Sequence, residues 1–355
     1  MAQRAETRPL LAISMGDPGG IGPEVTVKAL ADPARRARAR YRVHGSSAAM
    51  LNAAREAGID TFWSCVPRSP AHDRFEVNGP GDTGVVLLDS DGADGPPGAR
   101  PITHEPRATR EGGELSFRWV EEAIADARRG PGDPLRADAI VTAPISKEAW
   151  ALAGHGAFPG HTELLGARFG VPHAAMMFEA DALRVILVTT HIPLAEVAPT
   201  ITTDRVLRTI RMGRDACVRL GIPSPRVAVC GLNPHAGEAG LLGDDEARAI
   251  SPAIAQARAE GIECAGPFPG DTVFNAALKK RFDIVVAMYH DQGLIPVKLL
   301  AFDRAVNVTL GLPIVRTSPD HGTAYDIAGL NRADPGSMAS AIDLAIRLCG
   351  RSAPG

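Results

Sequence analysis

Aromatic residues and cysteines are scarce in this chain of 355 residues. Phe, Trp and Tyr together make up 5% of it, which argues against the stacking surfaces that bind single-stranded nucleic acid. The five cysteines are odd in number and form no C-x-x-C pair. They therefore indicate reduced thiols in a cytoplasmic protein rather than a disulfide framework.

The chain also lacks a charge excess and long apolar runs. Its formal net charge is −3, with acids and bases interspersed, so we expect neither nucleic acid nor an anionic membrane as a partner. No apolar run approaches the length of a membrane-spanning helix, and the first nine residues lack the apolar core of a signal peptide. A chain of this length usually needs more than one core, which predicts two domains.

Three short apolar segments are each followed by a histidine, as buried strands with a ligand at one end would be. The segments are 183–190, 226–230 and 282–287, and the histidines are His191, His235 and His290. Open α/β sheets bind ligands beyond the carboxyl ends of their strands. A lone histidine there is better explained as a core residue, but the recurrence predicts a metal site. Imidazoles suit zinc or a similar ion, whereas magnesium prefers oxygen.

Apolar strand patterns alternate with amphipathic helix patterns along the whole chain, which predicts an α/β fold. Strands are expected at 9–15, 42–44, 137–142, 306–309 and 313–316, and helices at 25–30, 46–58, 114–129, 204–220 and 337–349. Pro, Gly and Asp are concentrated in 89–100, which we interpret as an exposed loop.

A glycine-rich turn, GDPGGIGPE at 16–24, joins the first expected strand to the first helix. Such a turn could hold phosphate with its backbone N–H groups. It is not the dinucleotide fingerprint, because Val25 stands where the last glycine belongs, and it is not a P-loop. Taken alone, it is as good a candidate for a tight structural turn as for a ligand loop.

Further residues could move protons or hold an anion. Asp271, Asp291 and Lys298 are the candidates for proton transfer, and His161, Thr162, Asn307 and Arg316 are the candidates for anion binding. Arg316 could hold phosphate or carboxylate bidentately. His161 and Thr162 open a predicted helix, whose amino end favours anions, although Thr162 could be only a helix cap. Together these groups predict a metal-assisted reaction on a small anion, either redox or hydrolytic.

Eight motifs resemble those of the 4-hydroxythreonine-4-phosphate dehydrogenase family of vitamin B6 biosynthesis. They are GDPGGIGPE, TAPISK, PGHTE, THIPL, GLNPHAGE, MYHDQG, NVTLGLP and RTSPDHGTAYDIAG. The resemblance runs from about Ile13 to Ala345. It implies an isocitrate/isopropylmalate dehydrogenase-like fold, built as a homodimer, with two α/β domains and a central cleft. The first domain would comprise 1–140 plus 318–355, and the second 141–317 with the metal and substrate site.

The resemblance implies NAD-dependent oxidation of 4-phosphooxy-L-threonine to 2-amino-3-oxo-4-phosphooxybutanoate. This product would lose CO₂ to give 3-amino-2-oxopropyl phosphate, in the biosynthesis of pyridoxal 5'-phosphate. The resemblance further implies a divalent metal; zinc fits the histidines best, with cobalt or magnesium as alternatives. The preference for NAD over NADP stays open.

The resemblance also implies roles for the candidate residues. His191 and His235 of one subunit, with His290 of its partner, would bind the metal. His161, Thr162, Lys298, Asn307 and Arg316 would contact the substrate, and Asp271 and Asp291 would lie close to the reacting centre. Lys298 or Asp271 would be the base. His321, Gly322, Thr323, Ala324 and Asp326 resemble the H-G-S-A-P-D-I-A-G loop with which isopropylmalate dehydrogenases hold the adenosine of NAD.

Two differences from the family motifs leave the choice of substrate undecided. Gly19 and Gly270 stand where the family more often has alanine, and each adds backbone freedom. The alternative substrates are a phosphothreonate- or phosphoerythronate-like acid and a cyclic cis-dihydrodiol. Phosphate acyltransferases share this general fold, and a fold alone does not fix function, but acyl transfer needs no histidine triad. A metal hydrolase would more typically carry H-E-x-x-H or a carboxylate-rich site.

Overall fold

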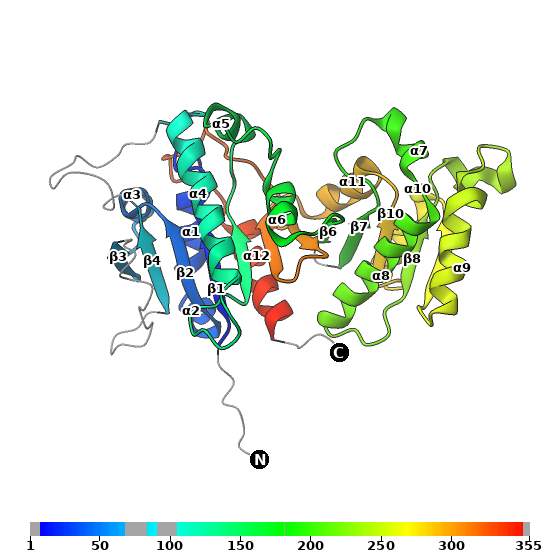
Figure 1. Cartoon of the computed structure of the whole chain (residues 1–355), viewed down its shortest axis with the longest axis horizontal. Coiled ribbons are helices and arrows are strands. Elements are labelled where there is room, and N and C mark those ends of the chain that lie inside the picture. The colour runs from blue at the N-terminus through cyan, green and yellow to red at the C-terminus, as the bar shows by residue number, and fades with distance from the viewer. Residues whose placement is uncertain (1–7, 68–83, 91–104, 181, 351–355) are drawn as a thin grey trace, which may run out of the picture. The chain divides into compact units, whose positions relative to one another are not determined.

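The computed structural model describes residues 8–67, 84–90, 105–180 and 182–350 (Figure 1). The chain divides into two compact units, which we call unit 1 (up to Pro172, and Leu312–Gly350) and unit 2 (His173–Gly311). Each unit combines a sheet with helices, which confirms the predicted α/β class. Residues 141–172 and 312–317 belong to unit 1, whereas the sequence analysis assigned them to the second domain.

Unit 1 contains a parallel sheet with the strand order β3-β4-β2-β1-β5-β12. The strands are β1 (Leu10–Ser14), β2 (Arg40–Gly45), β3 (Ser64–Pro67), β4 (Val85–Asp89), β5 (Ala139–Thr142) and β12 (Val315–Pro319). The helices are α1 (Gly22–Leu30), α2 (Pro33–Arg38), α3 (Ser47–Ala57), α4 (Arg110–Ala127), α5 (Lys147–Leu152), α6 (His161–Phe169) and α12 (Gly336–Cys349). The central strands are buried along their length, as parallel strands covered by helices are.

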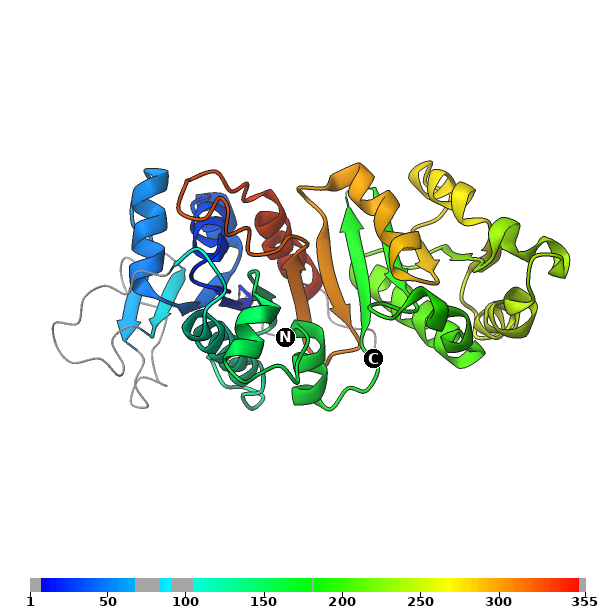
Figure 2. The same cartoon turned by 90° about the horizontal axis from the view of Figure 1, so that it is seen from above.

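Unit 2 contains a mixed sheet with the strand order β11-β6-β7-β10-β8-β9, in which β6 runs antiparallel to both of its neighbours. The strands are β6 (Ala175–Ala180), β7 (Leu183–Leu187), β8 (Val227–Cys230), β9 (Cys264–Phe268), β10 (Ile284–Ala287) and β11 (Val306–Leu310). The helices are α7 (Val197–Thr200), α8 (Thr203–Arg219), α9 (Ser251–Ala259), α10 (Gly270–Leu278) and α11 (His290–Ala301), with the short turns η2 (Leu194–Glu196), η3 (Pro234–Gly240) and η4 (Glu246–Ile250). Figure 2 gives a second view of the same elements.

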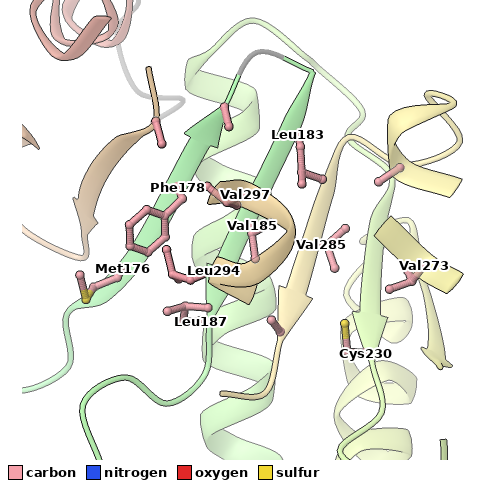
Figure 3. Packing of buried hydrophobic residues seen from close by; sticks show 14 of the residues in the cluster. Met176, Phe178, Leu183, Val185, Leu187, Cys230, Val273, Val285, Leu294 and Val297 are labelled. Carbon is pink, nitrogen blue, oxygen red and sulfur yellow. The ribbon is translucent and has the colours of Figure 1, made fainter. Parts of the chain in front are cut away.

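The core of unit 2 holds α11 against the sheet (Figure 3). Phe178, Val185 and Val285 of three neighbouring strands pack against Leu294 and Val297 of the helix. Burying an apolar side chain of this size stabilises the fold by about 1.5–3 kcal/mol. The first residue of α11 is therefore fixed at the carboxyl end of β10.

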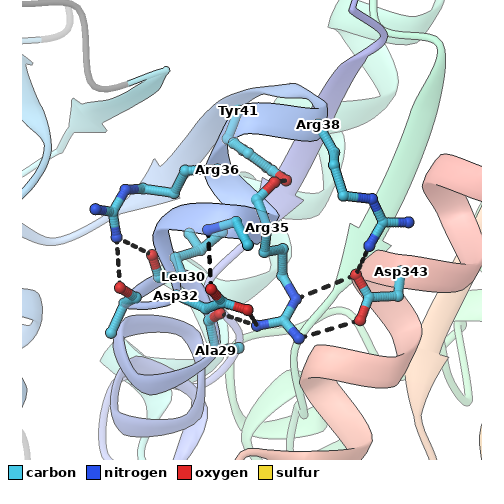
Figure 4. Close-up of polar contacts among 10 residues, drawn as sticks. Ala29, Leu30, Asp32, Arg35, Arg36, Arg38, Tyr41 and Asp343 are labelled. Atoms are coloured by element: carbon cyan, nitrogen blue, oxygen red, sulfur yellow. Dashed lines mark hydrogen bonds and ion pairs between the residues drawn. The ribbon is translucent and has the colours of Figure 1, made fainter.

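A group of charged side chains ties α12 to the amino-terminal part of unit 1 (Figure 4). Arg35 donates through Nε and Nη2 to the two carboxylate oxygens of Asp343, at 3.2 and 3.1 Å. Arg38 donates to the same carboxylate at 2.7 Å. Tyr41 donates its hydroxyl proton to the carbonyl oxygen of Arg35 at 2.6 Å. The bonds of Arg35 and Arg38 to Asp343 join segments about 300 residues apart and explain how unit 1 contains both ends of the described chain.

Two expectations from composition can be compared with the described residues. No helix among them combines the length and the apolarity needed to cross a bilayer. Asp89 and Ser90, which were placed in the exposed loop, are buried, and Asp89 accepts a hydrogen bond from the backbone N–H of Ser47 at 2.8 Å. Residues 91–100 of that loop lie outside the described residues.

Candidate active site

The three predicted metal-binding histidines follow three strands that are neighbours in the sheet of unit 2. His191 lies beyond β7, His290 beyond β10 and His235 beyond β8, and β10 pairs in parallel with both other strands. All three therefore lie at the same edge of the sheet. The ring centroids of His191 and His290 are 5.6 Å apart. Among the described residues of one chain, no three His, Cys, Asp or Glu side chains lie close enough together to hold a metal ion.

His290 is the first residue of α11 and is oriented by its neighbour. Its Nδ1 lies 2.7 Å from Oδ1 of Asp291. A carboxylate in this position fixes the ring and leaves Nε2 for another partner, as in many metal-bound histidines. The donor set at this edge thus fits a borderline divalent ion in chemistry. The role of each histidine stays a prediction.

His235 lies on a left-handed turn. Residues 235–239 all have positive φ, including 52° at His235 and 43° at Glu238. Each non-glycine residue in this conformation costs about 1–2 kcal/mol, and such strain is concentrated at functional sites. The turn leaves His235 exposed.

A buried carboxylate, Glu246, braces this turn. Its Oε1 accepts hydrogen bonds from the backbone N–H groups of Leu232 and Asn233, both at 2.8 Å. Its Oε2 accepts another from the side chain of Asn233 at 3.0 Å. The sequence analysis missed Glu246, because nothing in its local pattern distinguishes it from the other acidic residues near Asp244.

A pocket of about 630 Å³ in unit 2 brings three predicted residues together. His235, Asp271 and Asp291 line it, together with Tyr289 and Gln292. Asp271 lies in the first turn of α10. The pocket thus combines an imidazole with two carboxylates that could accept protons.

Lys298 and Asn307 do not line this pocket. Lys298 lies two helical turns after Asp291 on α11, so both side chains project from one face of the helix. Its Nζ lies 5.4 Å from the ring centroid of Phe302. Asn307 lies on β11, and its Oδ1 is buried with no hydrogen-bond partner among the described residues. An unsatisfied buried oxygen of this kind could accept a bond from a ligand.

Arg316 and His161 lie near each other in unit 1, Arg316 buried and His161 half-buried. Arg316 is 2% exposed and donates through Nη2 to Oγ1 of Thr142 at 2.7 Å. Burial lowers the pKa of Arg316 to about 10, so the guanidinium still carries its charge at neutral pH. Burial and then the charge of Arg316 hold the pKa of His161 well below its ordinary value, which keeps the imidazole neutral.

The surroundings of His161 suit an anion. Its Nε2 is buried and has no hydrogen-bond partner among the described residues. It is the first residue of α6, and Gly160 is the N-cap, so the alternative that Thr162 caps the helix is wrong. A neutral imidazole, a guanidinium and a helix amino end together could bind phosphate or carboxylate.

The glycine-rich turn uses its backbone N–H groups within the protein. Gly19 N–H donates to Oδ1 of Asp17 at 2.9 Å, and Gly20 N–H donates to the carbonyl oxygen of Asp17 at 3.0 Å. Ile21 N–H donates to the carbonyl oxygen of Thr323 at 2.9 Å. Of the two alternatives left open by the sequence, these bonds favour the structural turn.

This turn supports the segment predicted to bind the cofactor. Besides the bond from Ile21 to Thr323, the hydroxyl of Tyr325 donates to Asp17 at 2.7 Å. The Nε2 of His321 is buried without a hydrogen-bond partner among the described residues, which fits a polar group of a nicotinamide cofactor. The five predicted cofactor residues do not line the adjoining pocket of about 160 Å³, which lies against residues 18–20 and 328–329.

Both glycines that depart from the family pattern have close neighbours. A Cβ atom at Gly19 would lie 2.2 Å from the carbonyl oxygen of Glu105. A Cβ atom at Gly270 would lie 3.1 Å from Nε2 of Gln292. Alanine at position 19 would require the backbone at Glu105 to move, whereas at position 270 a side chain must yield by a few tenths of an ångström.

Known proteins resemble this chain over nearly its whole length. The family described as pyridoxal phosphate biosynthetic protein PdxA matches residues 93–345. A 4-hydroxythreonine-4-phosphate dehydrogenase of Geobacter metallireducens is 44% identical, covering 96% of each chain. A D-threonate 4-phosphate dehydrogenase of Cupriavidus necator is 43% identical, covering 97% of this chain and 98% of the relative.

The crystal structure of 4-hydroxythreonine-4-phosphate dehydrogenase from Klebsiella pneumoniae has a TM-score of 0.79 and 41% identity, covering 98% of this chain and 100% of the other. These relatives are named as dehydrogenases, in agreement with the predicted oxidoreductase acting on a CH–OH group. The extent of the match and the level of identity lead to one conclusion: the chain belongs to the PdxA family.

Proposed function

We propose that this protein oxidises 4-phosphooxy-L-threonine with NAD and a divalent metal, and that the product then loses CO₂ to give 3-amino-2-oxopropyl phosphate. The observation that carries the proposal is the position of His191, His235 and His290 beyond three adjacent strands. Relatives of 43–45% identity named 4-hydroxythreonine-4-phosphate dehydrogenase support the choice of substrate.

The three histidines hold the metal, and zinc suits their nitrogen donors better than magnesium does; cobalt is a further alternative. When bound, the metal would supply Lewis acidity beside the substrate hydroxyl, and the nicotinamide would supply the hydride acceptor. Asp291 orients His290 through the 2.7 Å contact with its Nδ1.

Either Asp271 or Lys298 takes the proton of the substrate hydroxyl. Asp271 lines the same pocket as His235, which supports its role. A general base must come within hydrogen-bond reach of the proton that it removes.

Arg316, His161, Thr162, Lys298 and Asn307 bind the substrate. The charge of Arg316, retained despite burial, supports an anion partner. The Nε2 of His161 and the Oδ1 of Asn307, buried without hydrogen-bond partners in the described parts of the chain, support polar contacts to the substrate. His321, Gly322, Thr323, Ala324 and Asp326 hold the cofactor.

The protein acts as a homodimer whose metal site is completed by His290 of the partner subunit. The apolar stripe of α11 supports a second copy as the partner of this helix. Ile295 and Leu299 of α11 and Phe302, its C-cap residue, lie on one face and are 59%, 83% and 69% exposed. Apolar residues at positions i, i+4 and i+7 of a helix form a continuous surface, and α11 begins with His290.

A second candidate substrate is D-threonate 4-phosphate or a similar phosphorylated acid, because the Cupriavidus necator relative with that name is almost as similar. The two substrates differ at C2, which carries an amino group in 4-phosphooxy-L-threonine and a hydroxyl in D-threonate 4-phosphate. Both offer a phosphate, a carboxylate and a C3 hydroxyl to the same residues. A cyclic cis-dihydrodiol lacks the phosphate.

Incubation of the protein with a divalent metal and NAD or NADP, and with each of the three substrates, tests these proposals. We expect NADH to form fastest with 4-phosphooxy-L-threonine, to stop forming after chelation, and to return with zinc or cobalt. Faster oxidation of the phosphorylated acid would transfer the assignment to that substrate. Full activity in thoroughly demetallated protein would contradict the role of the histidines.

A further inference from the structure

A continuous series of hydrogen bonds links the ends of three strands in unit 2. Thr189 donates through its backbone N–H and its hydroxyl to the carbonyl oxygen of Met288, at 3.1 and 2.8 Å. The N–H of Met288 donates to Oε1 of Gln292 at 2.6 Å. Nε2 of Gln292 donates to the carbonyl oxygen of Gly231 at 2.8 Å. We call this series the loop bridge.

The loop bridge connects the segments that carry the three histidines. Thr189 precedes His191, Met288 precedes His290, and Gly231 precedes His235, each by two to four residues. Gln292 is the only side chain in the series that bonds to two different strand ends. The position of the loop with His235 relative to Met288, and through Met288 to the loop with His191, therefore depends on its amide group.

The surroundings of the bridge keep it in place. Thr189 and Met288 are 3% and 0% exposed. Gly270 packs so closely against Gln292 that an added Cβ atom would come within 3.1 Å of Nε2. Gly231 is further held by its own N–H, which donates to the carbonyl oxygen of Phe268 at 2.8 Å. A buried carbonyl that loses its donor costs about 1–3 kcal/mol, so the bridge is favoured over looser arrangements.

We propose that Gln292 is a positioning residue: through Met288 it holds the loop of His235 in place relative to the loop of His191, and these are the two histidines that one subunit contributes to a metal site. Thr189 anchors the loop of His191 to the other end of the bridge, at the carbonyl oxygen of Met288. The proposal rests on the metal-binding role of the histidines stated under the proposed function. Residues that orient metal ligands typically change metal affinity or activity about 10–100-fold when they are replaced.

Gln292→Glu separates the two halves of the bridge. A carboxylate keeps the acceptor for the N–H of Met288 but has no proton to donate to Gly231 at neutral pH. Gln256→Glu makes the same chemical change at an exposed position of α9 and serves as the matched control. Thr189→Val removes only the hydroxyl bond to Met288 and retains the backbone bond, so it is a milder second variant.

Two measurements are made on the full-length protein. Hydrogen–deuterium exchange without metal reports the mobility of 231–240 and 288–292, and titration with Co²⁺ or Zn²⁺ reports metal affinity. We expect Gln292→Glu to speed exchange in both segments and to weaken metal binding about 10-fold or more. Thr189→Val should act in the same direction but less, and Gln256→Glu should match the wild type.

Unchanged exchange in Gln292→Glu overturns the bridge, whatever the wild type binds. Faster exchange with unchanged metal affinity overturns the positioning role. If exchange is faster but the wild-type protein binds no metal, the histidines are not metal ligands; the positioning role falls with the proposed function, while the bridge itself stands.

Discussion

Arg316 places a full positive charge in the interior of unit 1. The side chain is 2% exposed, and its Nη2 donates to the hydroxyl of Thr142. The nearby carboxylate of Glu163 partly offsets the lowering of the Arg316 pKa by burial. A phosphate or carboxylate of the substrate would add a further opposite charge beside this buried guanidinium.

Arg316→Lys should raise KM for the phosphorylated substrate by about 10-fold or more, because lysine keeps the charge but lacks the planar fork that binds an anion through two bonds. The value of kcat should change less, since an anion anchor binds ground state and transition state alike. Initial rates over a range of substrate concentrations measure both constants. Arg211→Lys, at an exposed ion pair with Glu260, is the control. A loss of kcat at unchanged KM would assign Arg316 to the reacting centre instead.

A buried charge cluster joins two elements of unit 1, β2 and α4. His44 of β2 lies 3.0 Å from Asp126 and 3.3 Å from Glu122, both on α4, and Arg42 lies 3.3 Å from Asp126. Burial disfavours the charged imidazole, but the hydrogen bonds and charges of Asp126 and Glu122 outweigh it and raise the pKa of His44 above 6.5. The pKa of Asp126 is lowered: burial opposes this, but bonds to His44 and the charge of Arg42 outweigh it.

The pH dependence of stability follows from these shifts. Because the pKa of His44 is raised in the folded state, its contribution to the free energy of unfolding is complete below about pH 6.5. This contribution is lost as the pH rises through the folded-state pKa. Urea unfolding of the wild type and His44→Gln should therefore differ most near pH 6 and converge at higher pH. His173→Gln, at an exposed histidine, should parallel the wild type. A difference that grows with rising pH would contradict the charged state of His44.

The whole-molecule prediction concerns the subunit that supplies His290. If two histidines come from one subunit and the third from its partner, His191→Ala and His290→Ala are each inactive alone but complement each other when mixed. Random exchange should restore about a quarter of wild-type activity, since half of the dimers are mixed and each has one intact site. NADH formation after subunit exchange measures this. A mixture that exchanges its subunits but remains inactive would show that one chain supplies all three histidines.

Local sequence patterns were sufficient to predict the helices and strands whose apolar residues recur with a clear period. They also predicted that the three histidines lie at one edge of a sheet. The apolar segments at 183–190, 226–230 and 282–287 became β7, β8 and β10. Hydrophobic periodicity is a local property, and parallel neighbours necessarily bring their carboxyl ends to one edge of a sheet. Helix α11 was not predicted from the sequence. It contains Gly293 and Pro296, which are both unfavourable inside helices. The helix forms through packing, and a Cβ at Gly293 would lie 2.5 Å from the side chain of Leu187.

The contacts that orient the site depend on residues far apart in the chain, and no local pattern predicts them. Gln292 bonds to Gly231 across 61 positions, Arg316 to Thr142 across 174, and Tyr325 to Asp17 across 308. Each bond requires two elements to pack in one register, which depends on the side chains of the whole core. For this reason the types of the site residues could be inferred from the sequence, whereas the burial of Arg316 and the loop bridge became visible only once the chain was folded.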